Sequence, residues 1–446
     1  MSDWIYVRLG ELLTESKIVD DNPDPDRKIR VKLNCKGVEK RPLKAEKEGA
    51  TKNYIRRAGQ FIYGKQNFHK GAFGVIPANL DGFSSSADLP AFDVDSRCFP
   101  QWIDYWFKTD NRYLRLAKHA KGVGSQRVNL NSFLKEKIAL PSLNLQSKII
   151  NKINKSNIAL ENLDTENENQ TTYLTKLRQA ILQEAIEGKL TESWRRENPL
   201  RKGDPDYDAD ALLEKIKAEK EKLVKEGKIK KQKPLVSIKA EEVPFELPEG
   251  WVWTRLGEIG SVVRGKSPIY SEEGELIVLN QKCVRWFHID NVWGKFVSEK
   301  WLKSVDEKLF TRVGDILVNS TGEGTIGRAA IVDEKSSNLL FDSHVLKYST
   351  LADSLYVLNC LNSKYSQSQI EESKGAKTTK QTELGVGNLS NLTIPFPPLA
   401  EQKAIVGRLE KLLSVIDELE KQVFERKEQA EQLMQAVLRE AFEGGK

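Results

Sequence analysis

Two segments of the chain carry nearly the same sequence. Leu177–Lys189 reads LRQAILQEAIEGK, and Leu433–Lys446 reads LMQAVLREAFEGGK, so the second begins 433 − 177 = 256 residues after the first. Each has apolar residues at intervals of three and four and then a glycine, a pattern typical of the C-terminal end of an amphipathic helix. A helix end that occurs twice indicates an internal duplication.

The duplication reaches back toward the start of the chain. Trp4–Leu12 reads WIYVRLGEL, and Trp251–Ile259 reads WVWTRLGEI. The segment AGQFIYGK at 58–65 corresponds in the same way to VGDILVNS at 313–320. Both members of that second pair place a glycine before a short β-type run. The chain is therefore expected to contain two copies of a variable α/β-type globule.

A third pair of segments leads into the repeated helices. IALPSLNLQSKII at 138–150 corresponds to IPFPPLAEQKAIV at 394–406, with Gln146 aligned on Gln402 at the same offset, 402 − 146 = 256. A proline-rich stop before an apolar periodic segment marks a helix start. Each globule is therefore expected to be followed by one long helix, and the constant offset means that neither helix has gained or lost a residue.

Apolar residues of both helices recur in a pattern typical of a coiled-coil seam. In the first helix, Asn167 and Gln170 interrupt this seam with polar side chains, which can fix the register of a helix pair at some cost in stability. The predicted seam residues are Ile149, Ile153, Leu160, Leu163, Leu174, Leu177 and Ile181 in the first copy, and Ile405, Leu409, Leu412, Ile416, Leu419, Val423, Leu433 and Val437 in the second.

The predicted fold is of the α+β class. Two α/β-type globules are separated by two long helices that form an antiparallel coiled coil, in a pseudo-two-fold internal repeat. In the alternative, each helix packs separately on its own globule. The predicted boundaries are 1–143 for the first globule, 144–190 for the first helix, 191–243 for a charged linker, 244–397 for the second globule and 398–446 for the second helix.

The linker contains the Lys/Glu segment LLEKIKAEKEKLVKEGKIKKQKP, which predicts a solvated helix followed by a basic tail. Contact of Lys228–Lys233 with DNA phosphates or a partner is the alternative. The whole chain of 446 residues has a net charge of +6, which is compatible with a polyanionic partner without identifying one.

The composition also bears on cellular location. Four scattered cysteines without a CxxC pair favour a reducing compartment. The N-terminus lacks the pattern of a signal peptide, and the sequence contains no apolar run long enough to cross a membrane. A soluble cytoplasmic protein is expected.

We interpret no segment of the sequence as a catalytic motif. The glycine-rich segment STGEGTIGRA at 320–329 lacks the Lys-Ser/Thr ending of a phosphate-binding loop and is interpreted as a turn between strands. HExxH, GxSxG and Asn-Pro-Pro-Tyr do not occur. The four histidines are isolated in the sequence and fit surface or packing roles. No catalytic residue and no metal ligand is predicted.

Several loops mix cations with Gln, Asn, Ser and Thr around glycines, and these are the candidates for DNA contact. Lys and Arg neutralise phosphates, while Gln, Asn and Arg can form paired hydrogen bonds with base edges. For each residue the alternative is an ordinary solvated loop. The candidates are Lys65, Gln66, Asn67, Lys121, Gly122, Gly124, Ser125, Gln126 and Arg127 in the first globule, and Arg264, Lys266, Ser267, Gln281, Asn319, Ser320, Thr321, Lys374, Lys377, Thr378, Thr379 and Lys380 in the second.

Together these motifs resemble the specificity subunit of a Type I restriction-modification system. The segments that carry the resemblance are LPEGWVWTRLGEIGSVVRGKSP, IPFPPLAEQKAIV, LRQAILQEAIEGKLT and AEKEKLVKEGKIKKQKP. The resemblance implies two target recognition domains, each reading one half of a bipartite, asymmetric site in double-stranded DNA. It also implies that the conserved helices dock two modification subunits.

The resemblance further implies where the chemistry resides. The modification subunits would carry S-adenosylmethionine and methylate adenine, and two restriction subunits with ATP and Mg would complete the nuclease. This chain would bind no cofactor and would not be an enzyme by itself. The alternatives are a stand-alone DNA-modifying enzyme and a coiled-coil scaffold that does not read DNA.

Overall fold

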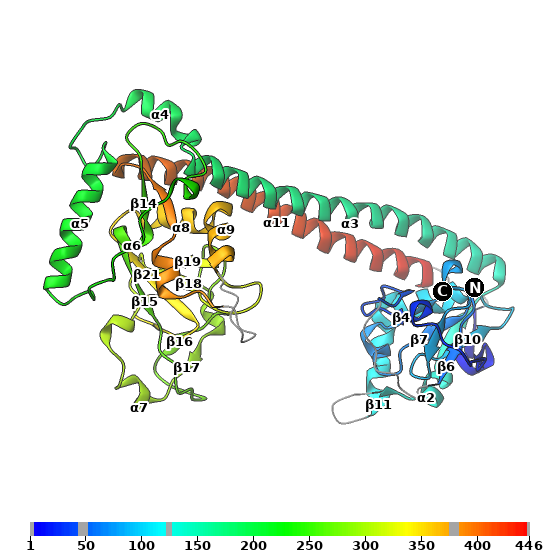
Figure 1. The fold of residues 1–446 in the computed structure, drawn as a ribbon. Coiled ribbons are helices and arrows are strands. Elements are labelled where there is room, and N and C mark those ends of the chain that lie inside the picture. The colour runs from blue at the N-terminus through cyan, green and yellow to red at the C-terminus, as the bar shows by residue number, and fades with distance from the viewer. Residues whose placement is uncertain (1–3, 43–51, 122–126, 374–382, 444–446) are drawn as a thin grey trace. The chain divides into compact units, whose positions relative to one another are not determined.

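The computed structural model describes residues 4–42, 52–121, 127–373 and 383–443, with the side chains of 118–121 left undescribed (Figure 1). The chain forms two compact units. The first comprises Met1–Gln170 and Gln422–Lys446, and the second comprises Thr171–Lys421. Both boundaries fall inside long helices, so each unit contains a globule together with one end of each helix.

The globule of the first unit is built on an antiparallel sheet of order β2-β10-β7-β8. A separate two-stranded ladder pairs its first strand with the strand that leads into the long helix, with Ile5 opposite Leu140. The elements are β1 (Ile5–Arg8), β2 (Leu13–Ser16), β7 (Phe61–Tyr63), β8 (Phe73–Val75), β10 (Ala91–Val94), α1 (Pro100–Lys108), α2 (Leu130–Lys135) and β13 (Lys137–Leu140).

The globule of the second unit repeats this plan. Its antiparallel sheet has the order β15-β21-β18-β19, and its two-stranded ladder places Val252 opposite Phe396. The predicted duplication is therefore confirmed at the level of strand order. The elements are β14 (Val252–Arg255), α6 (Leu256–Ile259), β15 (Gly260–Arg264), β18 (Ile316–Asn319), β19 (Ala329–Ile331), β21 (Val345–Thr350), α8 (Ser354–Asn362), α9 (Lys364–Ser373), α10 (Val386–Ser390) and β22 (Thr393–Phe396).

The two globules differ in what is inserted into the shared plan. The first carries two extra small sheets, formed by β3 (Val19–Asp20), β6 (Asn53–Ile55) and β9 (Ser84–Ser86) and by β4 (Ile29–Val31) and β5 (Val38–Lys40), and a short β11 (Ala120–Lys121)–β12 (Arg127–Val128) ladder. The second carries a sheet of β16 (Ile277–Leu279), β17 (Lys295–Phe296) and β20 (Leu340–Phe341), with α7 (Glu299–Leu302) beside it. The two globules thus share the four-stranded sheet and the two-stranded ladder, whereas the inserted sheets differ between them.

Two long helices, α3 (Leu143–Ile186) and α11 (Leu399–Glu443), run antiparallel and side by side (Figure 1). Proline precedes each helix, at Pro141 and Pro398. After α3 the chain turns at Gly188, whose φ of 74° lies in the left-handed region that glycine adopts without steric cost. Gly444, the predicted end of the second helix, lies outside the described residues.

Ion pairs and a hydrogen bond join the helices along their length. Arg178 contacts Asp417 at 2.5 Å, and Lys152 contacts Glu440 at 2.8 Å. Gln170 accepts a hydrogen bond of 2.5 Å from Arg426, the residue that occupies its own position in the second copy. When two equivalent helices pair antiparallel, a residue lies opposite its own equivalent only at the midpoint of the pair. The contact between Gln170 and Arg426 marks that midpoint, so the two helices are paired in a symmetric register.

The seam itself is narrower than the sequence pattern predicts. Buried side chains follow one line, which includes Leu174 and Asn167 on α3 and Ile416, Val423 and Ala430 on α11. The second predicted line is less completely buried: Ile405, near the start of α11, is buried in the core of the second unit, whereas several other members of the line are exposed. Its exposed members are Leu177, Leu412, Leu419 and Leu433, and Leu177 and its equivalent Leu433 are 47% and 57% exposed.

The repeated helix ends complete the cores of the globules. Leu182, Ala185 and Ile186 at the end of α3 are buried in the core of the second unit. Their equivalents Leu438, Ala441 and Phe442 at the end of α11 are buried in the core of the first unit. Each core thus includes the start of one long helix and the end of the other, so the helices do not pack separately on their own globules.

The aligned glutamines of the third repeat make the same contacts in both units. In the first, Gln146 accepts a hydrogen bond from Phe99 N at 3.0 Å and donates to Pro141 O at 2.8 Å. In the second, Gln402 accepts from Asp353 N at 3.0 Å and donates to Pro397 O at 2.8 Å. Phe99 and Asp353 are the N-cap residues of α1 and α8, so each amide joins a short helix to the start of a long one.

A second pair of glutamines holds the other end of the same short helices. Gln435 on α11 donates to the carbonyl of Lys108, the last residue of α1, at 3.3 Å. Its equivalent Gln179 on α3 donates to the carbonyl of Asn362, the last residue of α8, at 3.4 Å. We call Gln146, Gln402, Gln435 and Gln179 together the glutamine clamp. Through the clamp, one short helix in each globule contacts both long helices.

Replacement of Gln402 by methionine is expected to destabilise the N-terminus of α8. The variant Gln402→Met retains the volume but leaves the partly buried Asp353 N–H and the buried Pro397 carbonyl without this partner, at a cost of about 2–3 kcal/mol. Native-state hydrogen exchange at Asp353 measures that loss as faster opening. The neighbouring variant Lys403→Met is the control, because Lys403 is exposed and its loss should cost less than about 0.5 kcal/mol. Equal exchange rates in the two variants would contradict the clamp.

Candidate nucleic-acid interface

The predicted DNA-contact residues of the second globule gather around one short segment, Asp342–His344. Ser267 donates to Ser343 Oγ at 3.1 Å, and the guanidinium of Arg264 donates to Ser343 O at 3.4 Å. His344 O accepts from the backbone N–H of Ser320 at 2.9 Å. The ends of β15 and β18 are therefore brought together at one edge of the sheet, with the loop before β21 between them.

Polar side chains of this cluster bind one another. Thr321 Oγ1 donates to Gln281 Oε1 at 3.2 Å, and it lies 3.0 Å from Nδ1 of His344. Asn319 donates to Gln281 O at 3.1 Å but is fully buried, as is Ser320. Gln281, Thr321 and His344 keep part of their surface exposed and could reach a ligand. Asn319 and Ser320 are buried and therefore support the loop conformation instead of facing a ligand.

Position 265 requires a glycine because the neighbouring protein backbone leaves no space for a side chain. A Cβ at this position would lie 2.0 Å from the carbonyl oxygen of Asp342, closer than any side chain tolerates. Gly265 stands between the predicted contact residues Arg264 and Lys266. At Gly265 the close approach is made by the neighbouring backbone.

The predicted cations of this cluster already have protein partners. Arg264 forms an ion pair with Glu383 and donates to Leu384 O at 3.1 Å. Lys266 donates to Ser304 O at 3.3 Å. Arg264 in particular ties two loops together and is only partly exposed, which favours a structural role over free contact with phosphate.

The first globule brings two of its predicted loops together. Val128 N donates to Lys65 O at 2.8 Å, which places Lys65, Gln66 and Asn67 beside the strand that contains Arg127. Lys65 Nζ donates to Ala87 O at 2.6 Å, and Arg127 contacts Asp88 at 3.4 Å. Both cations therefore flank the segment 87–88.

Other predicted residues cannot be placed in this way. Lys121 lies in β11 opposite Arg127, and its side chain is not described. The remaining candidates lie outside the described residues, namely Gly122, Gly124, Ser125 and Gln126 in the first globule and Lys374, Lys377, Thr378, Thr379 and Lys380 in the second.

The structure also reveals a surface that the prediction largely missed. Lys282 and Arg285 approach the ring of Trp293 at 5.8 and 5.7 Å from its centroid, and Lys295 lies 5.0 Å from the ring of Tyr270. Only Gln281 was selected from this region. The signal that could have found it is the alternation of aromatic and basic residues in KCVRWFHIDNVWGKF at 282–296.

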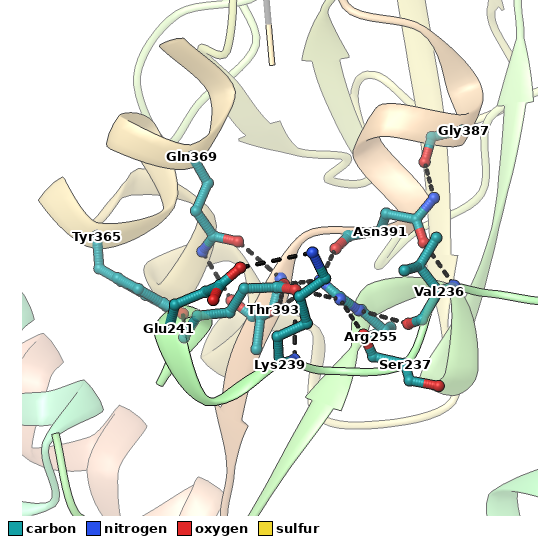
Figure 2. A network of polar contacts seen from close by, with 11 residues as sticks. Val236, Ser237, Lys239, Glu241, Arg255, Tyr365, Gln369, Gly387, Asn391 and Thr393 are labelled. Carbon is teal, nitrogen blue, oxygen red and sulfur yellow. Dashed lines mark hydrogen bonds and ion pairs between the residues drawn. The ribbon is translucent and has the colours of Figure 1, made fainter. Parts of the chain in front are cut away.

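A buried arginine anchors the linker at the base of the second globule (Figure 2). Arg255 donates to Val236 O and Ser237 O of the linker, both at 3.1 Å. It also donates to Asn391 O and Thr393 Oγ1, both at 2.6 Å. Its guanidinium thereby joins the linker to strand β22 and to the loop before it.

The carboxylate of Glu242 completes this network. It contacts Arg255 at 2.5 Å and accepts a hydrogen bond of 3.2 Å from Thr393. The bond from Arg255 lowers the pKa of Glu242 below its usual range, because it stabilises the charged form. Tyr365 donates to the backbone carbonyl of Glu242 at 3.0 Å. The end of the linker is thus fixed to the domain that follows it.

The linker helix α5 (Ala209–Lys225) also packs on the second globule. Ala209, Leu212, Leu213 and Ile216 are buried in its core, while the lysine-rich face remains exposed. The predicted Lys/Glu helix is present, but it is solvated on one face only. A short helix α4 (Glu192–Glu197) precedes it.

Within the part of the chain that the structure describes, no group of three or more His, Cys, Asp or Glu side chains could hold a metal ion. No helix among the described residues has the length and hydropathy needed to cross a bilayer.

The geometry defines a class: a duplicated α+β binding protein, with polar and basic loops presented on a repeated frame.

Comparison with known proteins places this class. Residues 248–429 match the family described as Type I restriction modification DNA specificity domain. The specificity subunits of the Type I restriction enzymes EcoEI and EcoAI, both from Escherichia coli, are each 33% identical to this chain. The EcoEI match covers 54% of the chain, and the EcoAI match covers 59%. The matched regions span 41% and 44% of those relatives' own lengths.

A solved chain from work on complex assembly and conformational transition of the type I R-M system superimposes with a TM-score of 0.62. It is 17% identical, and the match covers 98% of this chain and 97% of that one, so it supports the fold. Residues 248–429 thus match the DNA specificity domain family, and the chain is similar to Type I restriction-modification specificity subunits, as its sequence motifs suggested.

The anchoring role of Arg255 can be tested against its own repeat equivalent. Arg255→Met should destabilise the second unit by about 3 kcal/mol, because it removes several buried hydrogen bonds and leaves Glu242 without its cation. Arg8 holds the same place in the first copy but is exposed, so Arg8→Met should cost less than about 0.5 kcal/mol. Limited proteolysis of the linker near Val236 measures the difference. Equal cleavage rates in the two variants would rule out the anchor.

Proposed function

We propose that this chain is the DNA-specificity subunit of a Type I restriction-modification complex. Each globule would read one half of a bipartite, asymmetric site in double-stranded DNA. The observation that carries the proposal is the duplication: one sheet plan occurs twice, with different insertions, on a symmetric pair of helices. Two globules of common frame and different loops are suited to two different half-sites.

The proposed division of the chain follows the repeat. Residues 1–143 and 244–397 form the two recognition domains, 144–190 and 398–446 form the spacer helices, and 191–243 form the linker. The DNA-contact loops are those predicted from the sequence, among which Gln281 and Thr321 keep exposed polar groups. Arg264 fixes the position of the neighbouring loops through Glu383 and Leu384 and is not a primary DNA contact.

The helix pair would dock the modification subunits. Leu177 and Leu433 are equivalent residues that remain exposed on the two helices, and exposed apolar residues at matching positions favour two copies of one partner. S-adenosylmethionine would be held by these two subunits, and ATP and Mg by two restriction subunits that join them. The chain itself would supply recognition and no catalysis, in the cytoplasm.

Two other functions are less well supported. A stand-alone DNA-modifying enzyme would need a cofactor loop or a catalytic cluster. The glycine patterns GSVVRGKS at 260–267 and GEGTIG at 322–327 do not supply such a loop, because the first begins within strand β15, the second lies between strands β18 and β19, and neither leads into a helix. A scaffold that does not read DNA would have no use for two differently decorated recognition frames. Methylation or cleavage by the purified chain alone would favour the enzyme.

A domain exchange tests the proposal. Replacement of residues 1–143 by the corresponding domain of another specificity subunit should change one half of the methylated DNA motif and leave the other half intact, because each globule reads independently. The reciprocal exchange of 244–397 is the matched control and should change only the other half. Sequencing of methylated genomic DNA measures both results. A change in both halves, or in neither, would refute modular reading.

A further inference from the structure

An exposed surface of the second globule combines apolar and basic side chains. We call Lys282, Arg285, Val292, Trp293 and Lys295 the aromatic–cation surface. Val292 is 86% exposed and Trp293 is 46% exposed, although both are apolar. Such side chains next to each other on a turn suggest contact with a ligand, because exposed apolar groups gain from being covered.

The turn that presents these side chains is firmly held. Asn280 donates to the carbonyl of Trp293 at 2.6 Å, and Asp290 accepts from Val292 N at 3.2 Å. Asn291 donates to Lys335 O at 2.9 Å. Since side chains and backbone both fix the turn, Val292 and Trp293 are presented in a defined position rather than on a loose loop.

The cations of this surface keep their charge available. Lys282, Arg285 and Lys295 form no ion pair within the described part of the chain and instead lie near aromatic rings. By contrast, Arg264 is paired with Glu383, and Lys303 is paired with Glu299. A cation near an aromatic face retains its positive charge for a phosphate.

The surface is continuous with the polar cluster at Asp342–His344. Lys282 directly follows Gln281, whose side chain binds Thr321 in that cluster. The surface also belongs to the insertion around β16 and β17, for which the described residues of the first globule offer no equivalent sheet order. It therefore adds a contact that belongs to the second half of the molecule.

We infer that the aromatic–cation surface binds the sugar-phosphate backbone of double-stranded DNA next to the half-site read by the second globule. The inference rests on the proposed function and adds a division of labour to it. Lys282, Arg285 and Lys295 neutralise phosphates, and Val292 and Trp293 pack against the sugars. Contacts of this kind position the duplex and do not distinguish its bases.

The test uses the full chain assembled with its modification subunits and two duplexes, one with the methylated motif and one with that motif scrambled. The variant carries Lys282→Gln, Arg285→Gln and Lys295→Gln together. The control carries Lys215→Gln, Lys217→Gln and Lys225→Gln on the exposed face of α5, which removes the same charge. Affinity is measured by fluorescence anisotropy at several salt concentrations.

The surface variant should bind both duplexes at least roughly tenfold more weakly, and its logarithmic salt dependence should fall by about 2.7, or 0.9 for each lost phosphate contact. The ratio between the two duplexes should stay unchanged. Val292→Asp, a single change that places a negative charge on the turn, should weaken both in the same way. The control should match the unmodified protein.

Different outcomes overturn different parts of the account. If the surface variant and the control bind equally, the surface does not contact DNA and is left for another partner, such as an acidic protein. If the ratio between the duplexes changes, the surface reads bases and the inferred division of labour is wrong. If the unmodified assembly does not prefer its motif, the proposed function itself fails.

Discussion

The fold depends on four glutamine side chains that hold one short helix in each globule at both ends. Gln146 and Gln402 bind the N-cap backbone of α1 and α8 from the start of one long helix. Gln435 and Gln179 bind the last carbonyl of the same short helices from the end of the other long helix. Gln146 and Gln402 are buried, and each side-chain amide satisfies one donor and one acceptor at once, so each joins a short helix to the start of a long one.

This constraint explains why both long helices are needed in each unit. Leu182, Ala185 and Ile186 fill the core of the second unit, and Leu438, Ala441 and Phe442 fill that of the first. Each helix begins at one globule and ends in the core of the other, so the antiparallel pairing and the two cores are interdependent. The repeated sequence LxQAxLxEAxEG is therefore a docking segment that serves the opposite globule.

Much of this architecture could be predicted from the sequence because duplication is visible in the letters. The offset shared by Gln146 and Gln402, the proline stops and the helical periodicity led to two globules and an antiparallel pair. Periodicity alone could not tell which seam residues two helices would enclose, so Leu177, Leu412, Leu419 and Leu433 were predicted as seam residues but lie exposed. Burial depends on the number of neighbouring elements, which a periodic pattern does not state.

The candidate site was harder to predict, because a polar residue in a loop can serve the protein or a ligand. Arg264 and Lys266 fitted a DNA-contact pattern, yet Arg264 pairs with Glu383 and Lys266 donates to Ser304 O. Lys282, Arg285 and Trp293 lie together only because a turn brings them there. The recognition surface thus depends on loop conformation, whereas the frame beneath it follows from repeated core and clamp residues.

We propose that two globules on one symmetric frame read two different half-sites. Methylome sequencing of cells that contain this chain with its modification partner is the decisive measurement. It should yield one methylated motif composed of two unlike half-sites separated by a fixed gap of unspecified bases. A continuous motif without a gap, or no methylation that depends on this chain, would contradict the proposal.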